Sequence, residues 1–407
     1  MSLLKKLLYP HDLETFFSRI WEQDYLHIRR ADNPALHELL PALVSLEDLD
    51  ELLTVTYATG SHRSDALCLT REGHVLAPGE YLRPAAAGQP LVQIDVERAL
   101  TLYRHGASIT LNRVNEALPT VGGLCDELSA FFGVRVHANA YFTPADAQGF
   151  PTHFDTHDVI LLQLVGAKNW HIQPPPVQLP TPTMHDHGAA PTGPVSEVLL
   201  RSAELLYIPR GFVHQGIATD APSVHLTLGI TPYPWSWLLH RLLDDLERND
   251  ADFRRSVAPQ LGRAALDESR LTETLTMLAA RLVDTERVLR ALDHQVAGID
   301  RPGGMPLRGL LTQLTCHEEV TPASLVRLKQ SVQVDLSRSG DRIMLSFGHT
   351  VLTLPAFTEA ALRILCSGAA VCAAQLPAEI DDSGKLVLIK RLIREELLEF
   401  ADPLVPA

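Results

Sequence analysis

The spacing of apolar residues along the chain alternates between two periods. In residues 13–30, 41–60 and 94–132 they recur at three- and four-residue intervals, which predicts amphipathic helices. Two short runs inside these ranges, "YLHIRR" and "GASITLNRV", have the character of strands. The N-terminal third is therefore expected to be mainly helical, with strands between the helices.

From residue 134 to residue 232 the pattern consists of short β-rich runs separated by glycine and proline. Typical runs are "ANAYFTP", "DVILLQLVG", "NWHIQPPP", "ELLYIPRGFVHQGIA" and "VHLTLGI". Many short strands at regular spacing predict a sandwich or a small barrel. The proline-rich insert of residues 174–194 is expected to be an exposed loop.

The helical period returns after Pro234, in two long amphipathic stretches at residues 235–257 and 271–298. The segment "RPGGMPLRG" then marks a boundary. The residues that follow combine strands with helices, which indicates a small α+β domain such as a winged helix. The predicted fold class is therefore α+β, with three domains at residues 1–234, 235–302 and 303–407.

Composition narrows the classes of function. The chain has 407 residues and a formal net charge of −14, which argues against a protein that coats nucleic acid, because phosphate contacts need clustered lysine and arginine. No apolar run approaches the roughly 18 residues of a membrane helix, and the N-terminal pattern is not that of a signal peptide. The five cysteines form no CxxC pair. We therefore expect a cytoplasmic protein with free thiols and no thiolate zinc site.

A cluster of possible metal ligands stands in "THFDTHD". His153 and Asp155 are two residues apart, so in an extended strand they point to one face and can bind one ion together. An imidazole and a carboxylate, completed by a second imidazole, form the facial triad of non-haem Fe(II) oxygenases. His157 has the same parity, and geometry alone does not exclude it. Asp158 has the opposite parity and is expected to be a structural hydrogen-bonding group.

The third ligand of such a triad comes from a different strand. His185 and His187 form an HxH pair, but a loop holds a ligand poorly. His214 is better placed, because "ELLYIPRGFVHQGI" is predicted to be a strand, a tight Pro-Arg-Gly turn and a second strand, which together make a rigid hairpin. A histidine with a purely structural role would suit that hairpin equally well. His171 and His225 are further candidates in the strand-rich region.

The runs "NAYFTPADAQGFPTHFDTHDVILLQLVGAKNW", "LLYIPRGFVHQG" and "HLTLGI" together resemble the JmjC-type 2-oxoglutarate oxygenases, in the branch that hydroxylates ribosomal proteins. The resemblance is dense over residues 94–232 and looser over the rest of the chain. It implies a catalytic domain with a double-stranded β-helix (jelly-roll or cupin) fold and flanking helices, a helical dimerisation region and a C-terminal winged helix. It also implies that His153, Asp155 and His214 bind the iron.

The same resemblance implies roles for further residues. Lys168 would hold the distal carboxylate of 2-oxoglutarate in a charge-assisted pair, with Thr227 as a hydroxyl partner; a lysine in a solvent-exposed turn is the structural alternative. Asn139 and Tyr141 are similar to residues that contact the substrate side chain, and Asn139 is also expected to contact the cosubstrate. Some family members have a substrate-contacting serine where this chain has Gly229, so the target side chain stays open between histidine, arginine and others.

The resemblance thus implies an enzyme that uses Fe(II), 2-oxoglutarate and O2 to hydroxylate an arginine or histidine side chain of a protein, such as a ribosomal protein. The alternatives are a hydroxylase that tailors a natural-product peptide or amino acid, a methyl-lysine demethylase, and a cupin-like binding or scaffold protein without activity. The Leu-rich faces of residues 235–300 could be buried by packing within the chain, but the resemblance favours a homodimer. The final helix mixes acidic and basic residues, so direct nucleic-acid binding is not expected.

Overall fold

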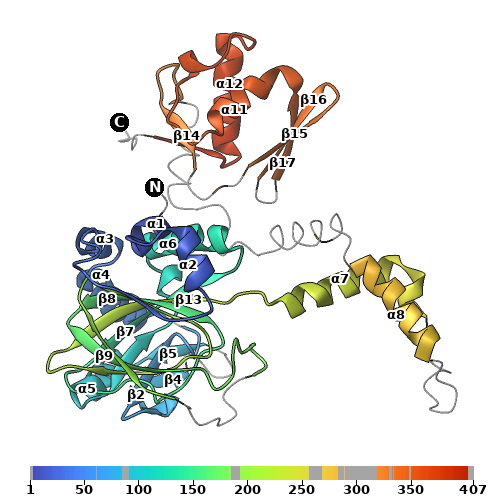
Figure 1. Ribbon diagram of the computed structural model, residues 1–407. Helices are drawn as coiled ribbons and strands as arrows, with labels where there is room; N and C mark the ends of the chain where they lie inside the picture. The colour runs from blue at the N-terminus through green and yellow to red at the C-terminus, as the bar shows by residue number, and fades with distance from the viewer. Residues whose placement is uncertain are drawn as a thin grey trace. The chain divides into compact units, whose positions relative to one another are not determined.

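The chain forms two compact units, Met1–Val296 and Ala297–Ala407 (Figure 1). The computed structural model describes residues 3–60, 62–84, 91–184, 193–255, 268–282, 319–329, 334–347 and 350–401, together with Val288 and Val332. Within these ranges, no helix combines the length and the apolar character that a membrane span requires.

Two antiparallel sheets make up the strand-rich part of the first unit. Their strands are β1 (Leu26–Ile28), β2 (Leu67–Arg71), β3 (His74–Val75), β6 (Ser108–Leu111), β7 (Val136–Thr143), β8 (Asp158–Val165), β9 (Ala167–Gln173), β10 (Ser196–Arg201), β11 (Leu205–Ile208), β12 (Val213–Ala218) and β13 (Ser223–Ile230). The larger sheet has the order β1-β11-β8-β13-β7-β6-β2-β3, and the smaller one has the order β10-β9-β12. The sandwich predicted from the short β-rich runs is confirmed. A separate short pair joins β4 (Leu82–Pro84) to β5 (Val92–Ile94).

Helices gather on one side of the strands, as Figure 1 shows for α1, α2, α3 and α6. The helices before β7 include α1 (Leu3–Leu8), α2 (Leu13–Arg19), α3 (Leu36–Leu43), α4 (Leu46–Glu51), a π-helical turn at Leu52–Tyr57, α5 (Val96–Arg104) and α6 (Pro119–Phe132). In Figure 1, α5 lies apart from the group formed by α1, α2, α3 and α6. Alternate residues of β8 belong to two different hydrophobic cores. Ile160 and Leu162 pack with the helices, whereas Val159 and Leu161 pack with the smaller sheet. The run "DVILLQLV" is therefore apolar without alternation, because the strand is buried on both faces.

The segment on either side of Pro209 does not form a hairpin, and that prediction is wrong. β11 pairs with β1 and β8 in the larger sheet, whereas β12 pairs with β9 in the smaller sheet. The turn between them carries the chain from one sheet to the other, which is how strands turn the corner of a sandwich. As a consequence, β12 and its His214 face the inner surface of the larger sheet.

After Pro234 the chain becomes helical, as predicted, in α7 (Trp235–Asn249) and α8 (Glu268–Leu282). The expected continuous helix over residues 235–257 is wrong beyond Asn249. There the Asp250 side chain accepts a hydrogen bond of 3.0 Å from the N–H of Asp252 and starts a separate 3-10 turn at Ala251–Arg254. Beyond Leu282, the predicted helical stretch lies outside the described residues except for Val288.

The second unit is a small α+β domain. Its strands are β14 (Val326–Leu328), β15 (Asp335–Ser339), β16 (Arg342–Phe347), β17 (Thr350–Pro355) and β18 (Leu398–Phe400), and its helices are α11 (Glu359–Leu365) and α12 (Asp382–Arg394). β15, β16 and β17 form one sheet, and β14 pairs with β18. Buried side chains such as Leu345, Leu362 and Ile389 form its own core. An independent core is what a separate domain requires.

Candidate active site

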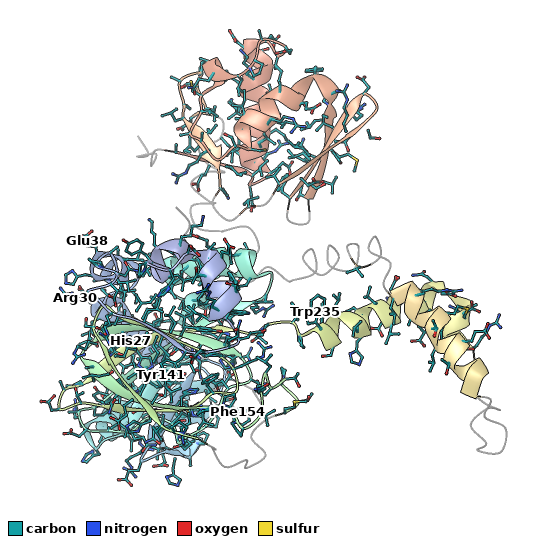
Figure 2. The ribbon with its side chains drawn as sticks, in the orientation of Figure 1. His27, Arg30, Glu38, Tyr141, Phe154 and Trp235 are labelled. Atoms are coloured by element: carbon teal, nitrogen blue, oxygen red, sulfur yellow. The ribbon has the colours of Figure 1, made fainter. Side chains whose placement is uncertain are left out.

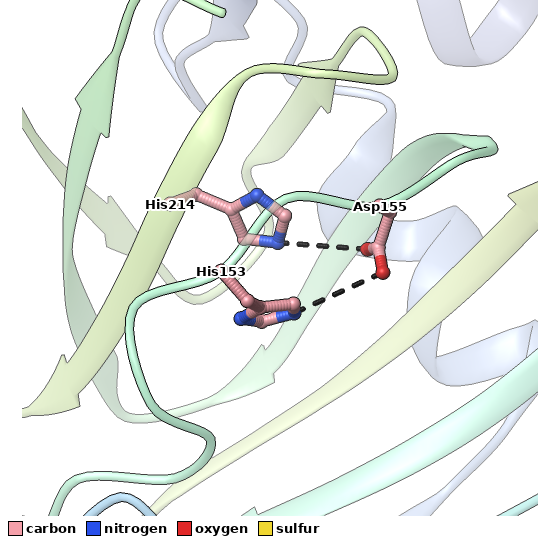
Figure 3. Close-up of side chains that lie close together, drawn as sticks. All are labelled: His153, Asp155 and His214. Atoms are coloured by element: carbon pink, nitrogen blue, oxygen red, sulfur yellow. Dashed lines mark ion pairs between the residues drawn. The ribbon is translucent and has the colours of Figure 1, made fainter. Parts of the chain in front are cut away.

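His153, Asp155 and His214 converge between the two sheets (Figure 3). Nε2 of His153 lies 3.8 Å from Oδ1 of Asp155. Nε2 of His214 lies 3.6 Å from Oδ2 of the same carboxylate. One donor atom from each residue lies within 4.8 Å of the others. Two imidazoles and one carboxylate at this separation match the facial donor set of a divalent first-row metal.

The backbone brings the two histidines together. His153 and His214 are partners in an isolated antiparallel bridge, with N–H···O distances of 3.2 and 2.8 Å in the two directions. The N–H of Gly211 donates to the carbonyl oxygen of Asp155 at 2.9 Å. Gly211 has a φ of +88°, which glycine adopts without the strain that other residues incur. The Pro-Arg-Gly turn therefore positions both Asp155 and His214.

Both histidines are held in the tautomer that a metal requires. Nδ1 of His153 lies 2.7 Å from the carbonyl oxygen of Pro151, and Nδ1 of His214 lies 3.0 Å from that of Phe212. A carbonyl can only accept, so each Nδ1 carries the proton and each Nε2 directs its lone pair at the Asp155 carboxylate. Such a backbone contact to the far nitrogen is the usual support of a metal-binding histidine.

The electrostatics of the three groups also suit a cation. Burial, with the neighbouring His153, lowers the pKa of His214 to about 4, so that His214 is neutral at pH 7. Burial raises the pKa of Asp155, but the surrounding imidazoles, led by His157 and followed by His214 and His153, hold it below its ordinary value. An ionised carboxylate and neutral imidazoles are the forms that coordinate a metal.

The segment that carries His153 and Asp155 is not the regular strand that the sequence suggested. Only His153 makes a bridge, Thr156 and His157 form a bend, and β8 begins at Asp158. His157 is not part of the group of donor atoms, and its ring lies beside His137 with 5.7 Å between the ring centroids. The equal parity of His157 with His153 therefore has no geometric consequence.

Asp158 has the structural role that its parity predicted. It is fully buried and accepts hydrogen bonds from the Tyr207 hydroxyl at 2.9 Å and from the Arg210 guanidinium at 3.0 Å. Arg210 also pairs with Glu22 at 2.5 Å. This network fixes the turn next to Gly211. The remaining candidate ligands lie elsewhere: His171 is 3.8 Å from Glu197 across β9 and β10, and His185 and His187 lie outside the described residues.

A narrow cavity extends from the triad into the interior of the sandwich. Its wall includes His153, Asp155 and His214, and also the following residues: Thr70, Ser108, Tyr141, Gly149, Phe150, Val159, Leu161, Lys168, Trp170, Gln215, Gly216, His225 and Thr227. These residues come from β2, β6, β7, β8, β9, β12 and β13 and from the segment between β7 and β8. The cavity is therefore a product of the whole sandwich.

Lys168 lies in the wall of this cavity and is not in a solvent-exposed turn. Its side chain is only 3% exposed, and its ammonium donates to Thr143 Oγ1 at 3.0 Å. A Cβ on Gly216 would lie 3.0 Å from Cε of Lys168, so glycine at this point of β12 makes room for the lysine. Burial lowers the pKa of Lys168 to about 7. A buried ammonium of this kind is ready to pair with an anion.

Several buried polar atoms of the wall have no hydrogen-bond partner among the described residues. They are Thr70 Oγ1, Ser108 Oγ, Trp170 Nε1 and His225 Nδ1. Buried polar atoms are almost always paired in folded proteins, so their concentration in one cavity indicates a polar ligand. Ser108 and Lys168 both border Gly149, where an added Cβ would be 3.9 Å from Ser108 Oγ and 3.7 Å from Lys168 Nζ. Metal donors at one end and a cation with hydroxyls elsewhere in the wall fit 2-oxoglutarate.

The other predicted site residues differ in whether they line the cavity. Thr227 and Tyr141 line the cavity. Asn139 is not among its described lining residues; its Oδ1 accepts a 2.9 Å hydrogen bond from the N–H of Arg113, and its side chain hydrogen-bonds Tyr141. Asn139 thus orients Tyr141. Contact of Asn139 with cosubstrate or substrate stays a prediction, as do the roles of Lys168 and Thr227.

Sequence inspection missed part of this wall. Thr70 on β2 and Ser108 on β6 stand far from the histidine-rich stretch, and nothing in their local sequence points to a site. The sequence suggests His225 only as a metal ligand. It lies instead in the wall, stacked on Tyr141 with ring centroids 4.7 Å apart. These residues could be identified only from the pairing of strands across the larger sheet.

Comparisons with known proteins indicate the family. A sequence model of the JmjC domain matches residues 114–238. The chain is 30% identical to ribosomal oxygenase 2 of Bos taurus over 298 residues, which are 70% of this chain and 62% of that protein. It is also 30% identical to ribosomal oxygenase 1 of Homo sapiens over 277 residues, 66% of this chain and 38% of that protein. The chain therefore spans less than two thirds of the length of these relatives.

A solved structure supports the same fold. The ribosomal oxygenase YcfD of Escherichia coli, in complex with cobalt and 2-oxoglutarate, matches with a TM-score of 0.52 and 16% identity, over 97% of this chain and 99% of that one. A likeness at this identity shows the fold. With the domain match and the curated relatives, it leads to one conclusion: this chain is a JmjC-domain protein related to the ribosomal oxygenases.

Proposed function

We propose that this protein is an Fe(II)- and 2-oxoglutarate-dependent oxygenase that hydroxylates an amino-acid side chain of a protein. The observation that carries the proposal is the cavity that joins the His153–Asp155–His214 triad to the buried ammonium of Lys168. When bound, the iron supplies the oxidative chemistry, in which O2 converts 2-oxoglutarate to succinate and CO2 and one oxygen atom enters a substrate C–H bond.

The side chains of the cavity have distinct tasks in this proposal. The two Nε2 atoms and the Asp155 carboxylate would hold the metal. Lys168 pairs with the distal carboxylate of 2-oxoglutarate, and the hydroxyls of Ser108, Thr70 and Thr227 offer further hydrogen bonds. Val159 and Leu161 form an apolar part of the wall, which excludes water from the reaction.

We propose a ribosomal protein as substrate, with arginine or histidine as the modified side chain. The support is the name ribosomal oxygenase shared by the mammalian relatives and the E. coli neighbour. The test is a search for one-oxygen mass gains on host proteins, comparing a deletion strain carrying the wild-type gene with one carrying Asp155→Ala. We expect a gain on a ribosomal protein only with the wild type. Identical protein masses in the two strains would refute the proposal.

One observation favours a second activity. A relative from Drosophila persimilis, 26% identical over 316 residues, is named a bifunctional lysine-specific demethylase and histidyl-hydroxylase. Demethylation releases the methyl carbon as formaldehyde, whereas hydroxylation keeps every carbon on the substrate. Formaldehyde release from methyl-lysine peptides, measured beside succinate, therefore separates the two activities.

We further propose that residues 235–302 form a dimerisation region and that residues 303–407 form a winged-helix-like domain. α7 buries Leu238, Leu242 and Leu246. On the neighbouring edge of the same helix, Trp235 is 80% exposed, Leu239 47% and Leu243 41%. Figure 2 labels Trp235 at the start of this helix. An apolar row at four-residue spacing is typical of a helix that packs against a partner. In α12, Arg391 is paired with Glu395 at 2.6 Å, which supports a role other than nucleic-acid binding.

The double variant Leu239→Glu, Leu243→Glu is expected to convert a dimer into a monomer, because two carboxylates cannot be buried in an apolar interface. Light scattering coupled to size exclusion measures the change. Arg248→Glu on the other side of α7 alters the net charge by the same amount and should leave the dimer intact. A wild-type monomer, or an unchanged dimer in the double variant, would contradict the proposal.

A further inference from the structure

The inner face of the larger sheet carries a row of polar side chains that begins outside the cavity. β7 and β13 pair antiparallel, with His137 opposite Gly229, Asn139 opposite Thr227, Tyr141 opposite His225 and Thr143 opposite Ser223. Thr143 is the hydroxyl that accepts from Lys168. His137 therefore stands at the end of the row away from Lys168, on the same face of β7 as Tyr141.

The ring of His137 occupies the space above Gly229. A Cβ on Gly229 would collide with Cε1 of His137 and lie 2.6 Å from its Nε2 and 3.0 Å from Cδ2 of His157. Any side chain at residue 229 would therefore have to displace His137. The imidazole of His137 fits in this position because Gly229 has no side chain.

Both imidazoles are available to a ligand. His137 and His157 are half-buried, and their rings contact each other with 5.7 Å between the centroids; within the described residues, no hydrogen bond engages either ring. Burial, with the neighbouring His157, lowers the pKa of His137 to about 4, so its imidazole is neutral at pH 7. A neutral imidazole offers one donor and one acceptor.

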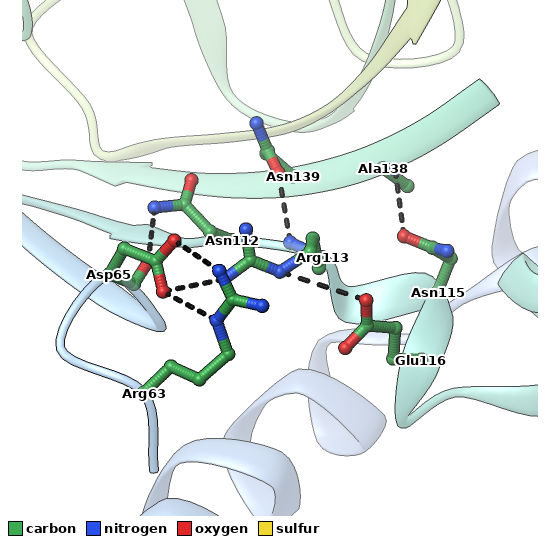
Figure 4. A network of polar contacts seen from close by, with 8 residues as sticks. All are labelled: Arg63, Asp65, Asn112, Arg113, Asn115, Glu116, Ala138 and Asn139. Carbon is green, nitrogen blue, oxygen red and sulfur yellow. Dashed lines mark hydrogen bonds and ion pairs between the residues drawn. The ribbon is translucent and has the colours of Figure 1, made fainter. Parts of the chain in front are cut away.

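The pair stands next to the triad. His157 follows Asp155 by two residues, and the charge of Asp155 acts on His137. The strand that carries His137 is held just beyond it, as Figure 4 shows. The N–H of Ala138 donates to Asn115 Oδ1 at 2.9 Å, and Asn139 accepts from the N–H of Arg113 at 2.9 Å. The Arg113 guanidinium is itself paired with Asp65 at 2.7 Å.

We propose that His137, supported by His157, is the residue that selects the side chain presented to the metal, and that it favours a planar side chain with N–H donors, a guanidinium or an imidazole. This inference rests on the proposed function. Such a group can donate to the free ring nitrogen of His137 and stack on its face. An aliphatic side chain can do neither, and an ammonium cannot stack as a planar group.

The test measures binding, with no turnover. The full-length protein is loaded with Co(II) and 2-oxoglutarate in the absence of O2, and peptides of one common flanking sequence carry Arg, His, Lys or Leu at the centre. The wild type should bind the Arg or the His peptide most tightly, and the comparison of these two identifies the target. His137→Ala should weaken that peptide about tenfold, the loss of one hydrogen bond and its stacking, and change the Leu peptide less than about twofold. His137→Gln, which keeps a donor and an acceptor, should recover part of the loss.

Two results would overturn the inference: equal binding of all four peptides by the wild type, or an equal effect of His137→Ala on all of them. Because the assay needs no oxidation, it separates this inference from the proposed function. If the iron-loaded protein produced no succinate, the proposed function would fail while the preference for one peptide could still be observed. Conversely, normal hydroxylation by the wild type together with an unchanged peptide preference in His137→Ala would refute this inference and leave the proposed function intact.

A second pair of variants tests the packing directly. Gly229→Ser alone should lower the melting temperature, because the new side chain collides with the His137 ring. His137→Ala combined with Gly229→Ser should recover most of that loss, since the space is then free. Residues in contact give such non-additive effects, whereas independent residues give additive ones. Additive changes in the melting temperature would show that the ring does not occupy the space above Gly229.

Discussion

Asp155→Ala is expected to abolish iron binding and product formation together. Loss of a residue that merely supports a metal ligand costs roughly ten- to a hundredfold in affinity or activity, so loss of a ligand should cost more than about a hundredfold. Asp155 provides the only carboxylate of the triad, and without it His153 and His214 offer two neutral donors that hold Fe(II) poorly. Iron content after dialysis and succinate formation with 2-oxoglutarate are the two measurements.

The matched control is Asp220→Ala, which removes an exposed carboxylate from the turn before β13. It should leave both iron content and succinate formation within about twofold of wild type, because surface substitutions of this kind have small effects. His153→Ala and His214→Ala should resemble Asp155→Ala. Near-normal iron binding and activity in any of the three would exclude this triad as the metal site.

Lys168→Met is expected to weaken 2-oxoglutarate binding by about a hundredfold, because a buried carboxylate would lose its cationic partner. Binding can be followed by calorimetry with the Co(II)-loaded protein. Lys168→Arg keeps a positive charge and should retain more affinity, although the larger guanidinium has to fit beside Gly216. Equal affinity of wild type and Lys168→Met would place the cosubstrate elsewhere.

The same lysine predicts a pH dependence with a defined sign. Burial lowers the pKa of Lys168 to about 7, so above that pH the ligand-free protein holds Lys168 neutral and must take up a proton when it binds a dianion. Affinity should be constant below about pH 7 and fall by up to tenfold per pH unit above it. Burial raises the pKa of Tyr141 and lowers those of His214 and His225, so these neighbours keep their charge in this window.

Calorimetry at about pH 8 in two buffers with different ionisation enthalpies should report an uptake of nearly one proton per bound 2-oxoglutarate. Lys168→Arg should abolish this uptake, because arginine stays protonated. The unfolded chain holds the lysine proton to a pH of about 10, so the stability of the ligand-free protein should rise with pH between about 7 and 10. Binding that is independent of pH in the wild type would contradict the assignment of Lys168.

Much of the fold could be predicted from the sequence, because burial leaves a periodic pattern. The alternation in "ANAYFTP" and the apolar run "DVILLQLVG" identify strands β7 and β8, and the period of three to four residues identifies the helices. The short strands β2, β3 and β10 could not be recognised in this way. These strands are stabilised by pairing with neighbours distant in sequence, so their own residues leave a weak local signal.

By itself, the sequence determined which residue types are available and which are near each other along the chain: His153 with Asp155, and Gly211 with His214. It could not determine which of these side chains face one another in the folded protein. A bend at Thr156 and His157 interrupts the expected strand, and the passage of the chain from β11 to β12 brings His214 across to His153. The partners of Lys168 and the contact of His137 with Gly229 also depend on strand pairing. Such contacts join distant segments, and only the packed sandwich specifies them, because each depends on the register of several strands at once.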